Sequence, residues 1–223
     1  MNKPINKYID HTLLKPEATR MDVVKLCTEA YENKFYAVCV NPFFVSTCKE
    51  ILNNSKVQVA AVVGFPLGAT TTNQKVAETR ECCENGATEI DMVINIGLLK
   101  AGNYDLVQED IAQVTNAAHE YGAKVKVIIE TCLLTEEEKI KACEAISMAG
   151  ADFAKTSTGF SSGGATVEDV ALMRKYCDPR VEIKASGGIR DLDTALAMIE
   201  AGADRLGVSA GLAIMEEYLR RQQ

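Results

Sequence analysis

The dipeptide Gly-Ala recurs at four points where a helical pattern ends and an apolar run begins. These points are Gly86-Ala87, Gly122-Ala123, Gly150-Ala151 and Gly202-Ala203. Glycine readily supplies the left-handed residue that ends an α-helix, and alanine leaves room for a tight turn into a strand. The chain therefore repeats a unit in which a strand closely follows a helix. Strands that alternate with helices pair in parallel through right-handed crossovers, so the repeat predicts an α/β fold.

Eight strands are expected, at about 8–12, 35–40, 57–63, 88–94, 124–130, 152–156, 181–185 and 204–208. One long amphipathic helix is expected from Gly102 to Tyr121. Eight strand–helix units in 223 residues fit a (β/α)8 TIM barrel, with residues 1–223 as a single domain. An open doubly wound sheet is the competing architecture. It is disfavoured because no strand is followed by Gly-x-Gly-x-x-Gly at the start of a helix, and no P-loop is present.

Composition narrows the classes of partner. The net charge of −7 disfavours nucleic acid and anionic membranes as partners. A small anionic substrate stays compatible with it, because charges are screened beyond roughly 8–10 Å at physiological salt. The sequence contains no apolar run of about 18 residues and no leader-like segment, so neither a membrane span nor a signal peptide is expected. A cytoplasmic location is therefore favoured.

Cysteine and histidine usage argues against a metal site. The eight cysteines form no Cys-x-x-Cys pair, and we interpret them as reduced, mostly buried thiols. The two histidines, His11 and His119, belong to no metal-type cluster, so a zinc site is not expected. No metal or organic cofactor is predicted.

Two short strands each carry a lysine near the carboxyl end. Residues 153–159 read Phe-Ala-Lys-Thr-Ser-Thr-Gly, and residues 181–188 read Val-Glu-Ile-Lys-Ala-Ser-Gly-Gly. Burial lowers the pKa of a lysine, and the neutral amine can form a Schiff base with a carbonyl. Lys155 taken alone is better interpreted as an edge-strand lysine that extends to solvent. Lys155 and Lys184 together, on neighbouring strands, are expected to lower each other's pKa and so to favour Schiff-base chemistry.

Other polar residues interrupt apolar strands at the ends where barrel enzymes place their active sites. They are Asp10 on the first strand, Asp91 and Asn95 on the fourth, and Glu130 on the fifth. Asp91 is the least easily explained as a surface residue, because Ile90, Met92 and Val93 surround it. The alternative for Asp91 is a structural salt bridge to one lysine. Asp10 and Glu130 are candidates that serve either catalysis or the orientation of a lysine.

Glycine-rich turns follow the last two expected strands, Ser186-Gly187-Gly188 and 207–211. Barrels often bind phosphate between these two loops through backbone N–H groups near a helix N-terminus. Glycines also simply turn the chain, but their position after these two strands favours a phosphate site.

The sequence resembles the deoxyribose-phosphate aldolase family of class I, Schiff-base aldolases. The resemblance covers nearly the whole chain and is most specific at 89–95, 153–160 and 183–190. It implies a (β/α)8 barrel in which Lys155 forms the Schiff base, Lys184 lowers the pKa of Lys155, and Asp91 takes part in proton transfer. The resemblance also implies a phosphate site at Gly159, Gly187, Gly188, Gly207 and Ser209. Asp10 is expected as a further catalytic residue, and Cys39 and Thr158 are expected as further substrate-binding residues.

Three positions depart from patterns found in the family. Some members have a phosphate-binding lysine where this chain has Phe160, and many have a second serine where it has Ala210. Some end in a tyrosine that assists proton transfer, whereas this chain ends Arg-Arg-Gln-Gln.

The resemblance implies a lyase that reversibly cleaves 2-deoxy-D-ribose 5-phosphate to D-glyceraldehyde 3-phosphate and acetaldehyde. Its partner is expected to be this small phosphorylated sugar. Two alternatives stay open, which are a Schiff-base aldolase for another phosphorylated sugar and a sugar-phosphate binding barrel without turnover. Both a homodimer and a homotetramer are compatible with the sequence.

Overall fold

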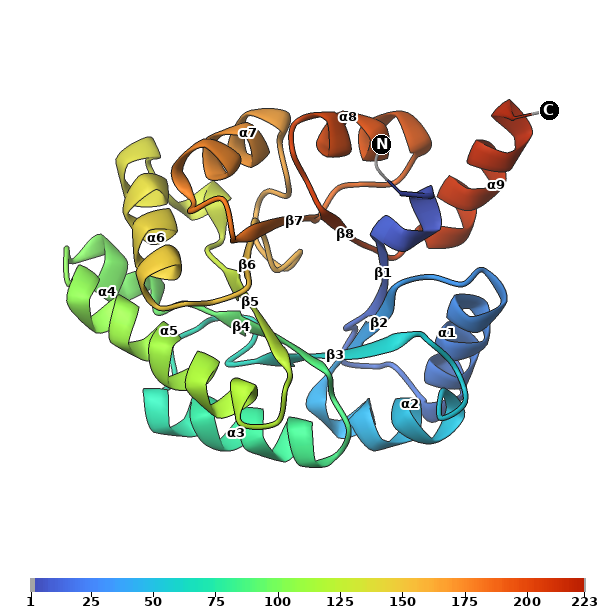
Figure 1. The fold of residues 1–223 in the computed structure, drawn as a ribbon, viewed down its shortest axis with the longest axis horizontal. Helices are drawn as coiled ribbons and strands as arrows, with labels where there is room; N and C mark the ends of the chain where they lie inside the picture. The colour runs from blue at the N-terminus through green and yellow to red at the C-terminus, as the bar shows by residue number, and fades with distance from the viewer. Residues whose placement is uncertain (1–2, 223) are drawn as a thin grey trace.

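Eight parallel strands form a closed barrel in the computed structural model, which describes residues 3–222. The strands follow one another in chain order around the barrel, and β1 closes it by pairing with β8 (Figure 1). Their bounds are β1 (Ile9–Leu13), β2 (Ala37–Val40), β3 (Gln58–Val63), β4 (Glu89–Val93), β5 (Lys124–Ile128), β6 (Phe153–Lys155), β7 (Glu182–Ser186) and β8 (Arg205–Val208). The expected (β/α)8 fold is confirmed.

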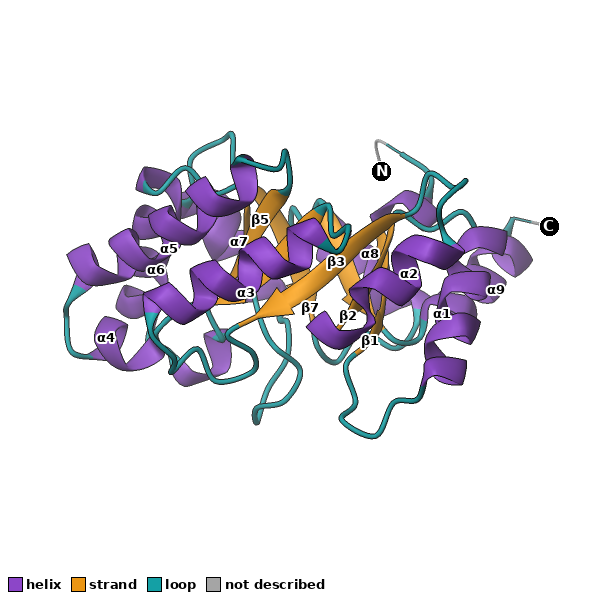
Figure 2. Ribbon diagram, turned by 90° about the horizontal axis from the view of Figure 1, so that it is seen from below, coloured by secondary structure: helices purple, strands orange, loops and turns teal. Residues whose placement is uncertain are grey.

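Helices surround the barrel on its outside (Figures 1 and 2). Their bounds are α1 (Arg20–Glu32), α2 (Val45–Ile51), α3 (Thr72–Glu84), α4 (Ile96–Lys100), α5 (Tyr104–His119), α6 (Glu136–Met148), α7 (Val167–Tyr176), α8 (Leu192–Glu200) and α9 (Gly211–Arg221). Short 3-10 helices are η1 (Ile5–Tyr8), η2 (Pro42–Phe44) and η3 (Thr131–Leu133). Within residues 3–222, no helix combines the length and the apolar character needed to cross a membrane.

The Gly-Ala joints end α3, α5, α6 and α8 as expected. Their glycines all have positive φ, from 71° at Gly122 to 113° at Gly202. At Gly86-Ala87 the alanine N–H donates to the carbonyl oxygen of Cys82, five residues back, at 2.9 Å. This bond satisfies a carbonyl that the helix end would otherwise leave without a partner, and the next strand starts two residues later.

Strands β4, β5 and β6 end one or two residues earlier than the sequence suggested. Asn95 lies beyond β4 and caps the short helix α4, where its Oδ1 accepts from the N–H of Leu98 at 3.1 Å. The region from Gly102 is therefore preceded by a separate helix, and α5 itself begins only at Tyr104. Glu130 lies beyond β5 with a left-handed backbone, at φ 56°.

Apolar side chains form two separate clusters. The larger one fills the space between the barrel and its helices. The smaller one lies inside the barrel on the β2–β3 side and consists of Leu14, Cys39, Ala60 and Val62 with Phe65 packed against them. The rest of the interior, on the side of β4 to β8 and β1, is filled by charged side chains, which sets the position of the site.

Candidate active site

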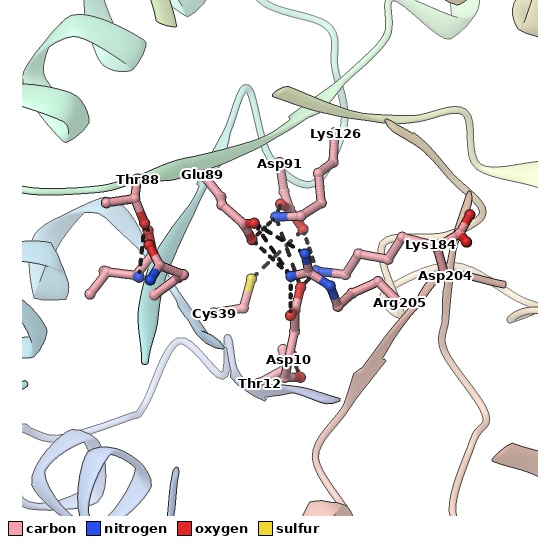
Figure 3. Close-up of polar contacts among 12 residues, drawn as sticks. Asp10, Thr12, Cys39, Thr88, Glu89, Asp91, Lys126, Lys184, Asp204 and Arg205 are labelled. Atoms are coloured by element: carbon pink, nitrogen blue, oxygen red, sulfur yellow. Dashed lines mark hydrogen bonds and ion pairs between the residues drawn. The ribbon is translucent and has the colours of Figure 1, made fainter. Parts of the chain in front are cut away.

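Seven charged side chains meet inside the barrel, and each residue is at most 2% exposed. Strand register brings them together: Asp91 pairs with Lys126, Lys155 with Lys184, and Lys184 with Arg205. Figure 3 labels six of these side chains, all except Lys155, and shows them converging from opposite walls of the barrel. The members of this charged cluster are Asp10, Glu89, Asp91, Lys126, Lys155, Lys184 and Arg205.

Asp91 is the centre of the cluster. Its Oδ2 accepts from Lys155 Nζ and Lys184 Nζ, both at 2.8 Å, and its Oδ1 accepts from Lys126 Nζ at 2.8 Å. Burial alone would raise the pKa of Asp91, but the three ammonium groups outweigh burial and hold the pKa well below its usual range. Asp91 is therefore a carboxylate shared by three lysines, more than the single salt bridge weighed from the sequence.

Asp10 and Glu89 supply the other negative charges. Asp10 accepts from Lys184 Nζ at 2.6 Å and from Arg205 Nη1 at 2.8 Å. Glu89 accepts from Lys126 Nζ at 2.6 Å and from the Arg205 guanidinium at 3.1 Å. Buried ions are tolerated when they are paired and hydrogen-bonded in this way. Asp10 thus bonds directly to the Lys184 ammonium.

The pKa values of Lys155 and Lys184 shift in opposite directions although the two lysines share Asp91. Burial lowers the pKa of Lys155, and the charge of Lys184 lowers it further against the opposing pull of Asp91. Burial would also lower the pKa of Lys184, but Asp10 and Asp91 together raise it above its ordinary value. The expectation that the two lysines lower each other's pKa is therefore wrong for Lys184, because Lys184 has two carboxylate partners.

The number of charges in the cluster also singles out Lys155. The cluster holds three carboxylates and four cations, so full ionisation leaves one surplus positive charge in a buried site. Loss of one proton balances the cluster. Lys155 has one carboxylate partner, whereas Lys126 and Lys184 each contact two carboxylates within 3 Å. Lys155 is therefore the ammonium that is least stabilised.

A cavity of about 400 Å³ lies at the carboxyl ends of β1, β6, β7 and β8, and Lys155 is the member of the charged cluster that lines it. Six of the seven residues expected to bind substrate also line it, namely Thr158, Gly159, Gly187, Gly188, Gly207 and Ser209. At Gly207 a Cβ would lie 3.0 Å from the Cε of Lys184, so this glycine also makes room for the lysine side chain.

Cys39 and Glu130 lie away from the cavity surface. Cys39 is fully buried, its Sγ lies 3.9 Å from Asp91 Oδ2, and burial raises the pKa of its thiol to about 11. Glu130 contacts no lysine of the cluster. It accepts hydrogen bonds from Thr158, through the backbone N–H at 3.2 Å and through the side-chain hydroxyl. Glu130 therefore fixes the loop after β6.

Comparison with known proteins now defines the family. The model of the DeoC/LacD family aldolases matches residues 5–217, nearly the full length of the barrel. The chain belongs to this aldolase family. The resemblance drawn from the sequence is thereby confirmed, and the protein is an enzyme of the aldolase class.

Two curated aldolases are similar to it throughout. The deoxyribose-phosphate aldolase of Thermococcus gammatolerans is 64% identical over 214 residues, which cover 95% of each chain. That of Brevibacillus brevis is 59% identical over 211 residues, again 95% of each chain. The solved, tetrameric deoxyribose phosphate aldolase of Aeropyrum pernix is 32% identical with a TM-score of 0.91, and the match covers 96% of this chain and 91% of that one.

Three charged residues of this aldolase were not identified from its sequence. Glu89 and Arg205 are the first residues of β4 and β8, where charged residues normally face solvent, and Lys126 is the middle residue of β5. Lys126 offered a signal all the same, because Val125 and Val127 flank it in a strand that helices cover. In a barrel the alternate face of such a strand points inward, so a lysine there has to be buried with partners.

Proposed function

We propose that this aldolase cleaves 2-deoxy-D-ribose 5-phosphate to D-glyceraldehyde 3-phosphate and acetaldehyde, and catalyses the reverse addition, through a Schiff base on Lys155. One observation carries the proposal: of the three lysines that contact Asp91, Lys155 lines the cavity, and burial lowers its pKa. Lys126 and Lys184 are fully buried beneath it. The amine that loses its proton most readily is thus the one a substrate can reach.

The Schiff base allows the carbon–carbon bond to break. The Lys155 amine attacks the aldehyde carbon C1, and loss of water gives an iminium ion. Loss of the proton from the C3 hydroxyl then releases the C3 fragment as an aldehyde, while the electron pair of the C2–C3 bond moves into the iminium. The resulting enamine is protonated at C2, and hydrolysis releases acetaldehyde and the free amine.

Asp91 is proposed to carry protons in these steps, acting through a water molecule between it and the substrate. Its Oδ2 is 2.8 Å from the Lys155 amine, which places a carboxylate next to the nitrogen that is proposed to react. Lys184 bridges Asp91 and Asp10 and is proposed to keep the pKa of Lys155 low while remaining charged itself. Cys39, which lies against Asp91, is proposed to shape the base of the substrate site.

The phosphate is proposed to bind at the opposite end of the cavity from the charged cluster. Backbone N–H groups around Gly187, Gly188 and Ser209 line this part, together with Gly159 and Thr158. Backbone donors in a glycine turn approach an anion closely because no side chain intervenes.

Borohydride trapping tests the proposal. Incubation with deoxyribose 5-phosphate and borohydride should add covalent mass to the wild-type protein and none to Lys155→Met. Lys175→Met, at an exposed lysine of α7, is the matched control and should label normally. Labelling of Lys155→Met would place the nucleophile elsewhere, and an unlabelled, inactive wild type would favour the sugar-phosphate binding protein. Trapping with a different sugar phosphate only would favour the other aldolase.

We also infer that the protein works in the cytoplasm as a homodimer or homotetramer. The tetrameric relative from Aeropyrum pernix supports assembly, and Phe43, 85% exposed, is an apolar side chain that an interface would cover. Light scattering on the purified protein measures the mass directly, and a monomer at working concentration would contradict assembly.

A further inference from the structure

The joint between α1 and β2 is built like the four Gly-Ala joints, but its sequence is Lys34-Phe35. The N–H of Phe35 donates to the carbonyl oxygen of Ala30, five residues back, as the alanine of each Gly-Ala joint does. Lys34 therefore takes the place of the glycine, and its φ is 53°. Apart from glycines, only Glu130 shares a positive φ among residues 3–222. A left-handed backbone is unfavourable for a residue with a Cβ, and proteins often keep such strain where the side chain serves a function.

Three lysines come together at this joint. Lys7 Nζ donates to the carbonyl oxygen of Lys34 at 2.7 Å, and Asn6 Nδ2 donates to the same oxygen at 3.0 Å. Lys56 lies on the loop between α2 and β3. Burial lowers the pKa of Lys7, and the charges of Lys34 and Lys56 lower it further, so three positive charges lie close together. The lysine ion pairs of the described residues all involve other lysines, so these three have no carboxylate partner there.

The three lysines line a cavity of about 360 Å³. Phe35 and Val57, which precede β2 and β3, line it too, so it lies at the amino ends of these strands. The cavity assigned to the substrate is at the carboxyl ends, on the other side of the barrel. Glu32 is the one carboxylate residue in the wall, and it forms no ion pair with a described residue. The volume suits a small molecule.

An exposed aromatic ring borders the same cavity. Tyr31, near the end of α1, lines it and is 60% exposed. The ring contacts among residues 3–222 involve other aromatic side chains, so the face of Tyr31 has no aromatic neighbour there. Phe35 is fully buried and Val57 is 9% exposed, which gives the cavity an apolar floor. The cavity thus combines positive charge with a ring on which a flat group can stack.

We propose that this cavity binds a phosphate monoester that carries a flat aromatic ring, which is the chemistry of a nucleoside monophosphate. Lys7, Lys34 and Lys56 supply the charge for a dianionic phosphate, and the aromatic ring stacks on Tyr31. An ammonium group has three donors, so Lys7 keeps two for a ligand besides its bond to the Lys34 carbonyl. A local positive field in a protein of net charge −7 concentrates such an anion at this end of the barrel.

Calorimetric titration with adenosine 5′-monophosphate (AMP) tests the site. The wild-type protein should bind AMP, and adenosine, which lacks the phosphate, far more weakly. Lys34→Gly and Lys56→Gln should each raise the Kd for AMP roughly tenfold, as expected for the loss of one charge-assisted contact. Lys34→Gly gives this joint the residue of the other four, so its Tm should not fall below that of the wild type. Lys175→Gln, at an exposed lysine of α7, is the matched control and should keep the wild-type Kd.

The ring and the position of the site have tests of their own. Tyr31→Ala should raise the Kd for AMP, and Tyr31→Phe, which keeps the ring, should not. Aldolase kcat/KM should be unchanged in Lys34→Gly, because Lys34 lies at the other end of the barrel from the cavity that Lys155 lines.

Three results would overturn the assignment. The first is a wild type that does not bind AMP. The second is an equal loss of affinity in Lys175→Gln, which would mean unspecific attraction to positive charge. The third is an unchanged Kd in Lys34→Gly. If deoxyribose 5-phosphate then displaced AMP, the nucleotide would occupy the active-site cavity. If the Tm fell instead, Lys34 would serve only the end of α1, where a cation favours the helix dipole.

Discussion

Lys155 has one carboxylate partner, and its two neighbouring lysines have two each. In a buried site this difference decides which ammonium is least stable, because each carboxylate favours the charged form and burial opposes it. The nucleophile of a Schiff-base enzyme has to be the lysine that loses its proton. All three lysines are at most 2% exposed, so they differ in the number of their carboxylate partners and not in burial.

Lys184→Leu should shift the pH–rate profile of this enzyme to higher pH. The substitution removes a positive charge beside Lys155 and leaves Asp91 with fewer cations to share, and both changes raise the pKa of Lys155. The activity that survives should therefore require more alkaline conditions to free the amine. The acid limb of kcat/KM against pH measures this shift. An unmoved limb with normal activity would place Lys184 outside the site.

Lys155→Met should abolish turnover without lowering the thermal midpoint. It removes the surplus positive charge of the cluster and leaves three carboxylates with three cations. Lys184→Met instead removes a partner of both Asp10 and Asp91, and breaking such a buried pair costs about 3–5 kcal/mol. At this chain length that loss corresponds to a fall of about 10 °C in Tm. Calorimetry measures the Tm of both variants. An equal fall in Tm would contradict the conclusion that Lys155 carries the surplus charge of the cluster.

The sequence predicted Lys155 as the reacting lysine but did not point to Glu89, Lys126 and Arg205, three of the six other members of the charged cluster. Asp91 was recognised because its apolar neighbours made exposure implausible, and the same test applies to Lys126 between Val125 and Val127. Which charges meet depends on strand register, such as Asp91 beside Lys126, and register is set by packing between distant segments. The number of carboxylate partners of each lysine, and with it the raised pKa of Lys184, could not be predicted without the strand register.

The loop from β6 to α7 connects the strand that carries Lys155 with the turn after β7, where phosphate binding is proposed. The N–H of Ala165 donates to the carbonyls of Ser186 and Gly187, both at 3.0 Å, so this loop is fastened to the end of β7. Gly164 lies so close that a Cβ added to it would be 2.3 Å from the carbonyl oxygen of Gly187. The two loops therefore hold each other in place around the cavity.

Gly164→Ala should raise KM for the phosphorylated sugar about tenfold, because the new methyl group forces the loop away from Gly187 and displaces the turn that is proposed to bind phosphate. Gly97→Ala on α4 is the matched control, since its added Cβ would have no neighbour closer than 3.4 Å. Steady-state kinetics on both variants decides the matter. Unchanged kinetics in Gly164→Ala would show that the loop adapts without moving the turn.

The order of the strands and their alternation with helices were predictable, because Gly-Ala joints and apolar runs are local signals. The end of β4 was not, since Asn95 continues an apolar stretch and only its hydrogen bond to Leu98 reveals the start of α4. Glu130 likewise followed an apolar strand, but its left-handed backbone turns it toward Thr158. Both errors lie at strand ends, where side-chain hydrogen bonds and not hydrophobic pattern decide where an element stops.

The charged cluster also connects the first and last strands of the barrel. Asp10 on β1 bonds Arg205 on β8 at 2.8 Å, and β1 and β8 are the strands whose pairing closes the sheet. Residues 195 positions apart in the chain thus meet in one buried ion pair. Because this contact connects the first and last strands, the ionisation of the cluster should influence the stability of the fold as well as the chemistry.

Acid should therefore unfold the protein through this cluster. The folded-state pKa values of Asp10 and Asp91 are lowered, although burial opposes this, because the surrounding cations favour the carboxylates. A carboxyl with a depressed folded pKa contributes stability that is fully present above its unfolded pKa, about 3.9, and is lost as pH falls through the folded value. Tm should thus hold between about pH 5 and 8 and drop steeply below about pH 4.

Asp10→Asn isolates the contribution of the cluster to this acid transition. The variant should have a lower Tm at neutral pH, because Lys184 and Arg205 each lose a buried anionic partner. Its Tm should also fall less between about pH 5 and pH 3, since one of the titrating carboxylates is gone. Glu216→Gln, at an exposed position on α9, is the control and should keep the wild-type slope. Parallel slopes for wild type and Asp10→Asn would mean that the acid transition arises from carboxylates outside the barrel.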